Sequence, residues 1–175
     1  VRSSLVARGM VADYNIHLDN PENPHVHIMT VTRDLETNID GTENVLGACA
    51  KHGKPFLLTS SSEIYGKNTN VPLHEDSDRI VGSPLKSRWS YSEAKAIDES
   101  LAFFHYTQNK LPVRIVRLFN TVGLRQIGQY GMVVPRFVSA AISGEAISVY
   151  GDGKQSRAFC HIDDVTEALL LVIDS

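Results

Sequence analysis

Several features that would mark a specialised protein are scarce in this chain. Its two cysteines, Cys49 and Cys160, lie far apart in 175 residues, which excludes the disulfide framework of a small secreted domain. No apolar run approaches the roughly 18 residues that a membrane-spanning helix needs. The net charge of −3 provides no basic surface for nucleic acid or anionic membranes. We therefore expect a cytoplasmic protein with reduced thiols and with neither nucleic acid nor membrane as a partner.

Metal-ligating residues are present but dispersed. The seven histidines are scattered, and His25 and His27 could in principle chelate a metal. No cysteine or carboxylate cluster accompanies this pair. We therefore expect no metal site.

The remaining composition is ordinary for a globular domain, with 42% hydrophobic and 21% charged residues. In helix 90–109, Ile97, Leu101 and Phe104 are spaced to form a buried stripe. Alternating strands and helices predict an α/β fold with a doubly wound parallel sheet. The patterns predict helices over 34–52, 90–109, 133–142 and from Asp163 or Asp164 onward, strands over 11–18, 55–60, 112–119, 147–150 and 159–162, a turn over 20–24, and a polar loop over 67–88.

The most informative spacing is Tyr91 followed four residues later by Lys95. Positions i and i+4 of a helix share one face, so both side chains can project into one site. An ammonium near a phenol favours the phenolate and lowers the tyrosine pKa, which suits Tyr91 to remove a proton from a hydroxyl. The same spacing alone is also common on solvated helix faces.

Three further motifs accompany this pair in a fixed order. They are Ser60-Ser61-Ser62-Glu63-Ile64-Tyr65-Gly66, then Arg117-Leu118-Phe119-Asn120-Thr121-Val122-Gly123, then Tyr150-Gly151-Asp152-Gly153-x-x-x-Arg157-x-Phe159. With them the chain resembles the extended short-chain dehydrogenase/reductases, and among these the NAD-dependent nucleotide-sugar epimerases, dehydratases and decarboxylases. The resemblance runs from about residue 34 to the end. It implies a Rossmann-like fold, NAD as cofactor and a nucleotide-sugar substrate.

One family feature is missing. Such enzymes open with a strand, a Gly-x-x-Gly-x-x-Gly loop and a helix that hold the cofactor pyrophosphate, and none of the twelve glycines forms that pattern. We therefore expect a fragment that lacks the first strands of the Rossmann unit. In this interpretation, residues 1–125 form a partial NAD-binding domain with the catalytic segment. Residues 126–175 form part of the substrate lobe with a returning strand and helix.

The resemblance implies a role for each residue of the catalytic segment. Tyr91 takes the proton of the sugar C4 hydroxyl, Lys95 holds the nicotinamide ribose, and Ser61 orients the C4 oxygen. Ser60 and Phe119 are expected to line the cofactor site with them. For Ser61 the structural alternative is a strand-end serine that satisfies loop backbone.

Substrate contacts are implied elsewhere. In the resembling enzymes the position of Asn120 contacts the nucleotide-sugar, and that of Arg157 grips the diphosphate. Tyr150 and Ser62 are expected at the substrate as well, Tyr150 through backbone contacts to the base. The alternatives are an Asx-turn for Asn120 and a solvated charge beside Lys154 for Arg157.

Two other residues match family positions. Asn38 corresponds to an asparagine near the active site, and it could instead brace the fold. We expect Tyr65 to be structural.

The triplet Ser61-Ser62-Glu63 bears on the reaction. Resembling dehydratases have Thr-Asp-Glu there, so elimination would lack its acid at Ser62. The triplet is most similar to the Thr-Ser-Glu of UDP-glucuronate decarboxylases, in which C4 oxidation creates a β-keto acid that loses CO2. We include Glu63 among the catalytic residues, and Arg157 matches an arginine implicated in that chemistry. A 4-epimerase is the alternative reaction, and a catalytically inactive regulator or scaffold is the alternative of another class.

The resemblance also implies a homodimer formed by a four-helix bundle. The candidate helices are 34–52 and 90–109, and the second presents Phe103, Phe104 and Tyr106 close together.

Overall fold

The computed structural model describes residues 12–16, 26–30, 35–124, 126 and 132–174. The chain divides into two compact units, residues 1–118 and residues 119–175. The predicted turn over 20–24, His25, and the ends of the predicted strand 11–18 lie outside the described residues.

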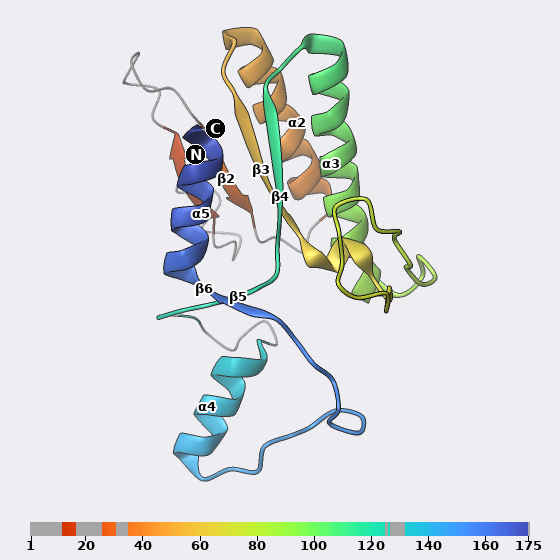
Figure 1. Ribbon diagram of the computed structural model, residues 1–175, viewed down its shortest axis with the longest axis vertical. Helices are drawn as coiled ribbons and strands as arrows, with labels where there is room; N and C mark the ends of the chain where they lie inside the picture. Colours follow the sequence, from red (N-terminus) through yellow and green to blue (C-terminus); the bar gives the residue numbers. More distant parts are fainter. Residues whose placement is uncertain (1–11, 17–25, 31–34, 125, 127–131, 175) are drawn as a thin grey trace. The chain divides into compact units, whose positions relative to one another are not determined.

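The first unit is built on a four-stranded sheet in the order β1-β2-β3-β4 (Figure 1). The strands are β1 (Ala12–Ile16), β2 (Val26–Thr30), β3 (Phe56–Ser61) and β4 (Val113–Leu118). Strands β2, β3 and β4 are parallel, whereas β1 pairs antiparallel with β2 at the edge. β3 is buried along nearly its whole length, as expected for a strand with a neighbour on each side and a covered face.

Two crossover helices connect these strands, α2 (Leu35–His52) and α3 (Ser90–Asn109). They pack side by side against β3 and β4 (Figure 1). The core between them contains Leu46, Cys49, Phe56, Leu58, Ala102 and Leu111. The α/β, Rossmann-like fold class predicted from the sequence is confirmed.

The predicted buried stripe of α3 is wrong. Ile97 and Phe104 are 41% and 55% exposed, and only Leu101 packs partly against the core. The buried face instead carries Ser92, Ala94, Lys95, Asp98, Ala102 and His105. Small and polar side chains take this face because the helices approach closely there and because the face forms the floor of the candidate site.

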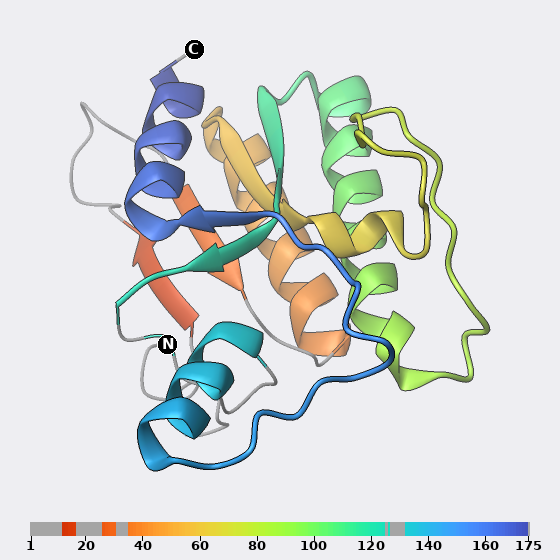
Figure 2. The same ribbon diagram turned by 60° about the horizontal axis from the view of Figure 1, so that its bottom comes forward.

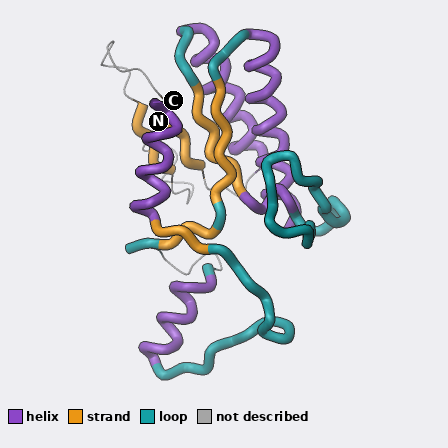
Figure 3. Tube along the Cα trace, viewed as in Figure 1, coloured by secondary structure: helices purple, strands orange, loops and turns teal. Residues whose placement is uncertain are grey.

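Between β3 and α3 the chain forms a 3-10 turn, η1 (Ser62–Tyr65), and then the irregular loop predicted from the sequence (Figure 3). Gly66 ends η1 with φ of 65°, and a Cβ there would lie 2.3 Å from the carbonyl oxygen of Ile80. Only glycine fits at this contact, which fixes where the loop leaves the site.

The second unit contains β5 (Asn120–Val122), α4 (Val133–Ser143), β6 (Phe159–His161) and α5 (Ile162–Asp174). β5 and β6 form a parallel pair (Figure 2). Gly144 ends α4 in the left-handed region at φ of 67°. The strand predicted over 147–150 is wrong: the segment is irregular and exposed, and β6 pairs with β5 instead.

Neither α2, α3, α4 nor α5 is both long enough and apolar enough to cross a bilayer. Cys49 and Cys160 are free thiols.

Candidate functional site

The site lies at the carboxyl ends of the parallel strands in the first unit, the edge where open α/β sheets bind ligands. The register of β3 with β4 pairs Ser60 with Arg117 and Ser61 with Leu118. The Ser61 hydroxyl accepts a hydrogen bond of 3.2 Å from the backbone N–H of Glu63 and so caps η1. This cap places Glu63 directly beside the strand end with an exposed carboxylate.

Tyr91 lies in the first turn of α3 and forms a hydrogen bond with the Ser61 side chain. Burial raises the pKa of Tyr91 above its ordinary value, and the carboxylates of Glu63 and Asp98 raise it further, whereas the bond with Ser61 lowers it. The expectation that this pKa is lowered is therefore wrong in this arrangement. The reason is that the phenol is desolvated while the Lys95 ammonium pairs with another group.

That group is Asp98, three residues further along α3. Lys95 Nζ lies 3.3 Å from Asp98 Oδ2, and the two side chains are 2% and 0% exposed. Asn38 Nδ2, on α2, donates to the same oxygen over 3.1 Å. Burial lowers the pKa of Lys95 and raises the pKa of Asp98, and the charge of each opposes the effect of burial on the other.

Sequence reasoning missed Asp98. The signal was available in Lys95-x-x-Asp98, because positions i and i+3 of a helix are also neighbours on one face. The residues that were predicted as catalytic do come together: Ser61 and Glu63 act on Tyr91, and Asp98 acts on both Tyr91 and Lys95.

The guanidinium of Arg117 connects the elements that surround the site. Arg117 on β4 forms two hydrogen bonds of 2.9 and 2.8 Å with Glu99 on α3, and its Nη1 donates to the Tyr65 hydroxyl over 2.9 Å. The same nitrogen donates to the backbone carbonyl of Glu75 over 2.7 Å. The bonds to Glu99 raise the already high pKa of Arg117. One cation therefore joins β4, α3, η1 and the following loop, which supports the structural role predicted for Tyr65.

The loop that follows η1 is also fixed at the N-terminal end of α3. Arg79 forms an ion pair of 3.2 Å with Glu93 and donates to the carbonyl of Ile64 over 3.2 Å. Trp89, two residues before Tyr91, is buried, and the guanidinium of Arg88 lies 4.6 Å from the centre of its ring. These contacts fix the helix start that presents Tyr91.

Ser60 and Ser62 belong to the first unit, at the end of β3 and in η1, whereas the other predicted residues belong to the second unit. Asn120 Nδ2 donates to the carbonyl of Ala158 over 2.9 Å, which joins β5 to the segment before β6. Arg157 is exposed and donates to the carbonyl of Ser156, and Tyr150 and Phe119 are 73% and 41% exposed. Their predicted roles at cofactor and substrate stay predictions.

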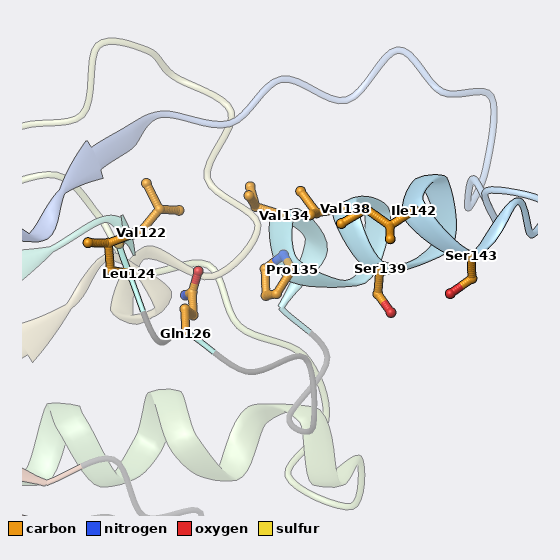
Figure 4. Close-up of a pocket in the computed structure, with 10 residues that line it drawn as sticks. Val122, Leu124, Gln126, Val134, Pro135, Val138, Ser139, Ile142 and Ser143 are labelled. Carbon is orange, nitrogen blue, oxygen red and sulfur yellow. The ribbon is translucent and has the colours of Figure 1, made fainter.

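The second unit also has a pocket of about 510 Å³ between the end of β5 and one face of α4 (Figure 4). Its lining is largely apolar, with Gln126 as a polar group near the strand end (Figure 4). The lining residues are Val122, Gly123, Leu124, Gln126, Val134, Pro135, Val138, Ser139, Ile142 and Ser143.

The first unit suits a ligand that carries hydroxyl groups. The ammonium of Lys95 has three donors, and Asp98 is its one side-chain acceptor at hydrogen-bond distance among the residues that the structure describes. The hydroxyl of Ser60 is buried and, within the same residues, has no hydrogen-bond partner. Spare donors beside a half-buried phenol fit a nicotinamide ribose and a sugar hydroxyl, the groups that Lys95 and Tyr91 would hold.

Comparison with known proteins agrees with this geometry. The model of the "NAD dependent epimerase/dehydratase family" matches residues 5–175. The chain is 46% identical, over 80% of its length and 43% of the relative's, to a UDP-N-acetyl-alpha-D-glucosaminuronate decarboxylase of Bacillus cytotoxicus. It is 36% identical to UDP-glucuronic acid decarboxylase 1 of Danio rerio, over 93% and 39% of the two lengths.

Among solved structures, UDP-glucuronic acid 4-epimerase from Bacillus cereus, in complex with UDP-glucuronic acid and NAD, superposes with a TM-score of 0.68. The identity is 28%, over 79% of this chain and 41% of that one. The chain thus spans less than half the length of these relatives, all of which are enzymes. These matches show that the chain belongs to the NAD-dependent epimerase/dehydratase family.

Proposed function

We propose that the full-length protein that contains this chain decarboxylates a UDP-linked hexuronic acid by transient oxidation at C4. The observation that supports this most is that Ser61 and Glu63 at one strand end act on Tyr91, with Lys95 one turn further along the same helix. The names of the relatives point to the same substrate class, because the two decarboxylases and the epimerase all act on UDP-sugars that carry a carboxylate.

The chain's own residues account for the oxidation. Ser61 orients the C4 hydroxyl, and Tyr91, after losing its own proton, accepts the proton of that hydroxyl. Lys95 would hold the ribose of the cofactor through the ammonium donors that Asp98 leaves free. When bound, NAD would supply the reversible hydride transfer that side chains cannot.

Decarboxylation follows from the substrate. A ketone at C4 makes the C5 carboxylate a β-keto acid, whose CO2 leaves because the carbonyl accepts the remaining electron pair. Glu63 is exposed at the strand end beside Tyr91, where its carboxylate can assist this step. The adjacent Ser62 cannot supply the acid that elimination of water requires.

A 4-epimerase is the second candidate, favoured by the likeness to the Bacillus cereus enzyme. It needs the same Tyr91, Lys95 and Ser61. In that case the keto sugar is reduced from its other face without loss of carbon, and Glu63 is a loop carboxylate with a structural role.

Product mass distinguishes the two reactions. The full-length protein is given UDP-glucuronate, UDP-N-acetylglucosaminuronate or UDP-glucose in separate reactions with NAD, and the products are separated by chromatography, which resolves C4 epimers, and identified by mass. We expect a product lighter by one CO2 from at least one of the two acids and none from UDP-glucose. A product of unchanged mass that has the opposite C4 configuration would establish the epimerase instead.

We also infer a homodimer. Phe103, Phe104 and Tyr106 are 61%, 55% and 54% exposed on α3, an apolar surface that a second copy would cover. The rings of Phe103 and Tyr106 lie 6.2 Å apart and so form one continuous patch. Light scattering across micromolar concentrations should give the dimer mass, and a strict monomer would contradict this inference.

For location, we infer the cytoplasm, supported by the two free thiols. Immunofluorescence or cell fractionation of the full-length protein tests this, and recovery from a secreted fraction would contradict it.

A further inference from the structure

A buried polar cluster lies beneath the catalytic pair and connects the two helices of the first unit. Asn38 on α2 and Asp98 on α3 are both 0% exposed, and Lys95 is 2% exposed. Asp98 Oδ2 accepts from Asn38 Nδ2 over 3.1 Å and from Lys95 Nζ over 3.3 Å. Thr42, one turn after Asn38 on α2, lies close enough to this carboxylate to favour its ionised form.

This arrangement defines where the lysine ammonium lies. A lysine side chain is flexible, and its charge is expensive to bury without a partner. Water cannot substitute for Asp98, because neither side chain is open to solvent. The carboxylate itself is held from the other helix, because Asn38 donates to Oδ2, the same oxygen that faces Lys95.

We propose that Asp98, held by Asn38, is a positioning residue that keeps the Lys95 ammonium charged and directed into the cofactor site. Two donors of the ammonium then remain for the hydroxyls of a ligand. The inference rests on the proposed function only in that the ligand is taken to be NAD.

The charged groups around Lys95 support this role. Burial lowers the pKa of Lys95, and the carboxylate of Asp98 is the largest opposing influence, followed by that of Glu99 on the same helix. The groups that α2 directs at the cluster, Asn38 and Thr42, are neutral. Glu99 is already engaged with Arg117, so Asp98 is the acid that keeps the amine protonated.

The first test measures the lysine directly. NMR of isotope-labelled lysine, with Lys95 assigned by its absence in Lys95→Met, gives the pKa of Lys95 in the wild type and in Asp98→Asn without any cofactor. We expect the variant to titrate about 1–3 pH units lower. Asp76→Asn removes the same charge from an exposed loop position and should leave the titration unchanged. An unchanged pKa in Asp98→Asn would overturn the proposal.

The second test uses NAD binding. Asp98→Asn should bind NAD at least about tenfold more weakly at pH 8, with the loss recovered as the pH falls and Lys95 regains its proton. If Asp98 only stabilised the fold, the loss of NAD affinity in Asp98→Asn would not depend on pH. That result would contradict the proposal. The measurement uses the full-length protein: if its wild type fails to bind NAD, the proposed function is wrong, while the NMR result still decides the role of Asp98.

The third test measures Tm and remains informative if Asp98→Asn folds poorly. In the Lys95→Met background, Asp98→Asn should be neutral or raise Tm, because the buried carboxylate has lost its partner. In the wild-type background the same change should lower Tm. An equal decrease in both backgrounds would show that Asp98 serves packing alone.

Discussion

The two units of this chain hold their predicted functional residues in different ways. In the first unit, Tyr91 and Ser61 are half-buried and interact across two elements, and the buried Lys95 pairs with Asp98, which Asn38 holds from α2. In the second unit, Arg157 and Tyr150 are exposed, and their bonds reach only residues close in the chain.

The difference shows how each kind of residue acquires its geometry. Crossover connections between parallel strands bring β3 and the start of α3 to one edge, so packing of the core aligns the catalytic groups. Residues on exposed loops have no such constraint and are expected to gain order from the ligand. The first unit is therefore expected to govern turnover and the second to govern affinity.

Removing the phenol tests the first half of this contrast. Tyr91→Phe in the full-length protein should reduce kcat by several orders of magnitude while changing nucleotide-sugar affinity by only a few fold, because a proton acceptor is lost but few ground-state contacts are. Steady-state kinetics and titration calorimetry measure the two effects. Turnover near the wild-type rate would refute the assignment of Tyr91.

Removing the guanidinium of Arg157 tests the expectation that the second unit governs affinity. Arg157→Ala should weaken nucleotide-sugar binding about ten- to a hundredfold, the value of a charge-assisted bond to a diphosphate, with a smaller effect on kcat. Lys154→Ala, a neighbouring exposed cation, is the control and should change affinity much less. Equal affinity of wild type and Arg157→Ala by calorimetry would place the guanidinium on the solvated surface.

The brace around Arg117 provides a stability test confined to one unit. Glu99→Gln removes the charge from a pair that is 21% and 13% exposed, and should destabilise the first unit by about 1–3 kcal/mol. Hydrogen exchange should then be faster in β3, β4 and α3, with α4 and α5 unaffected. Glu167→Gln on α5 is the matched control, and exchange that rises equally in both units would contradict two separate units.

Tyr91 gives the smallest expected effect, a shift in titration. Because burial raises its pKa, the phenol should ionise above the ordinary value of 10.0 when wild type is compared with Tyr91→Phe by ultraviolet absorption. The unfolded chain loses this proton first as the pH rises, so the contribution of Tyr91 to stability should decrease above pH 10.0. Ionisation below that value would mean that Lys95 controls the phenol after all.

Several parts of this picture follow from local sequence pattern. The strand–helix alternation predicted β3, α3 and β4, because buried parallel strands are continuous apolar runs and Gly or Pro marks their ends. The spacing of Tyr91 and Lys95 predicted one shared face. Both predictions depend only on residues that are close together in the chain, so the spacing of residue types is enough to make them.

Other parts depend on contacts between elements. The burial of Asp98 and the exposure of Phe104 follow from how α2 packs on α3, and hydrophobic periodicity along one helix could not choose between its faces. The segment 147–150 has an apolar pattern but no partner strand among the residues that the structure describes. The direction of the Tyr91 pKa likewise depends on which group receives the lysine ammonium.

The most direct test of a catalytic first unit separates oxidation from carbon loss. The full-length Glu63→Gln variant is mixed with NAD and a UDP-hexuronate, and reduced nicotinamide is followed by its near-ultraviolet absorbance while released CO2 is measured. C4 oxidation requires Tyr91, Lys95 and Ser61 but not Glu63, so we expect reduced nicotinamide to accumulate with little CO2, and neither signal in Tyr91→Phe. Reduced nicotinamide that forms equally in Tyr91→Phe would contradict the account, because the oxidation would then not depend on the site that the first unit assembles.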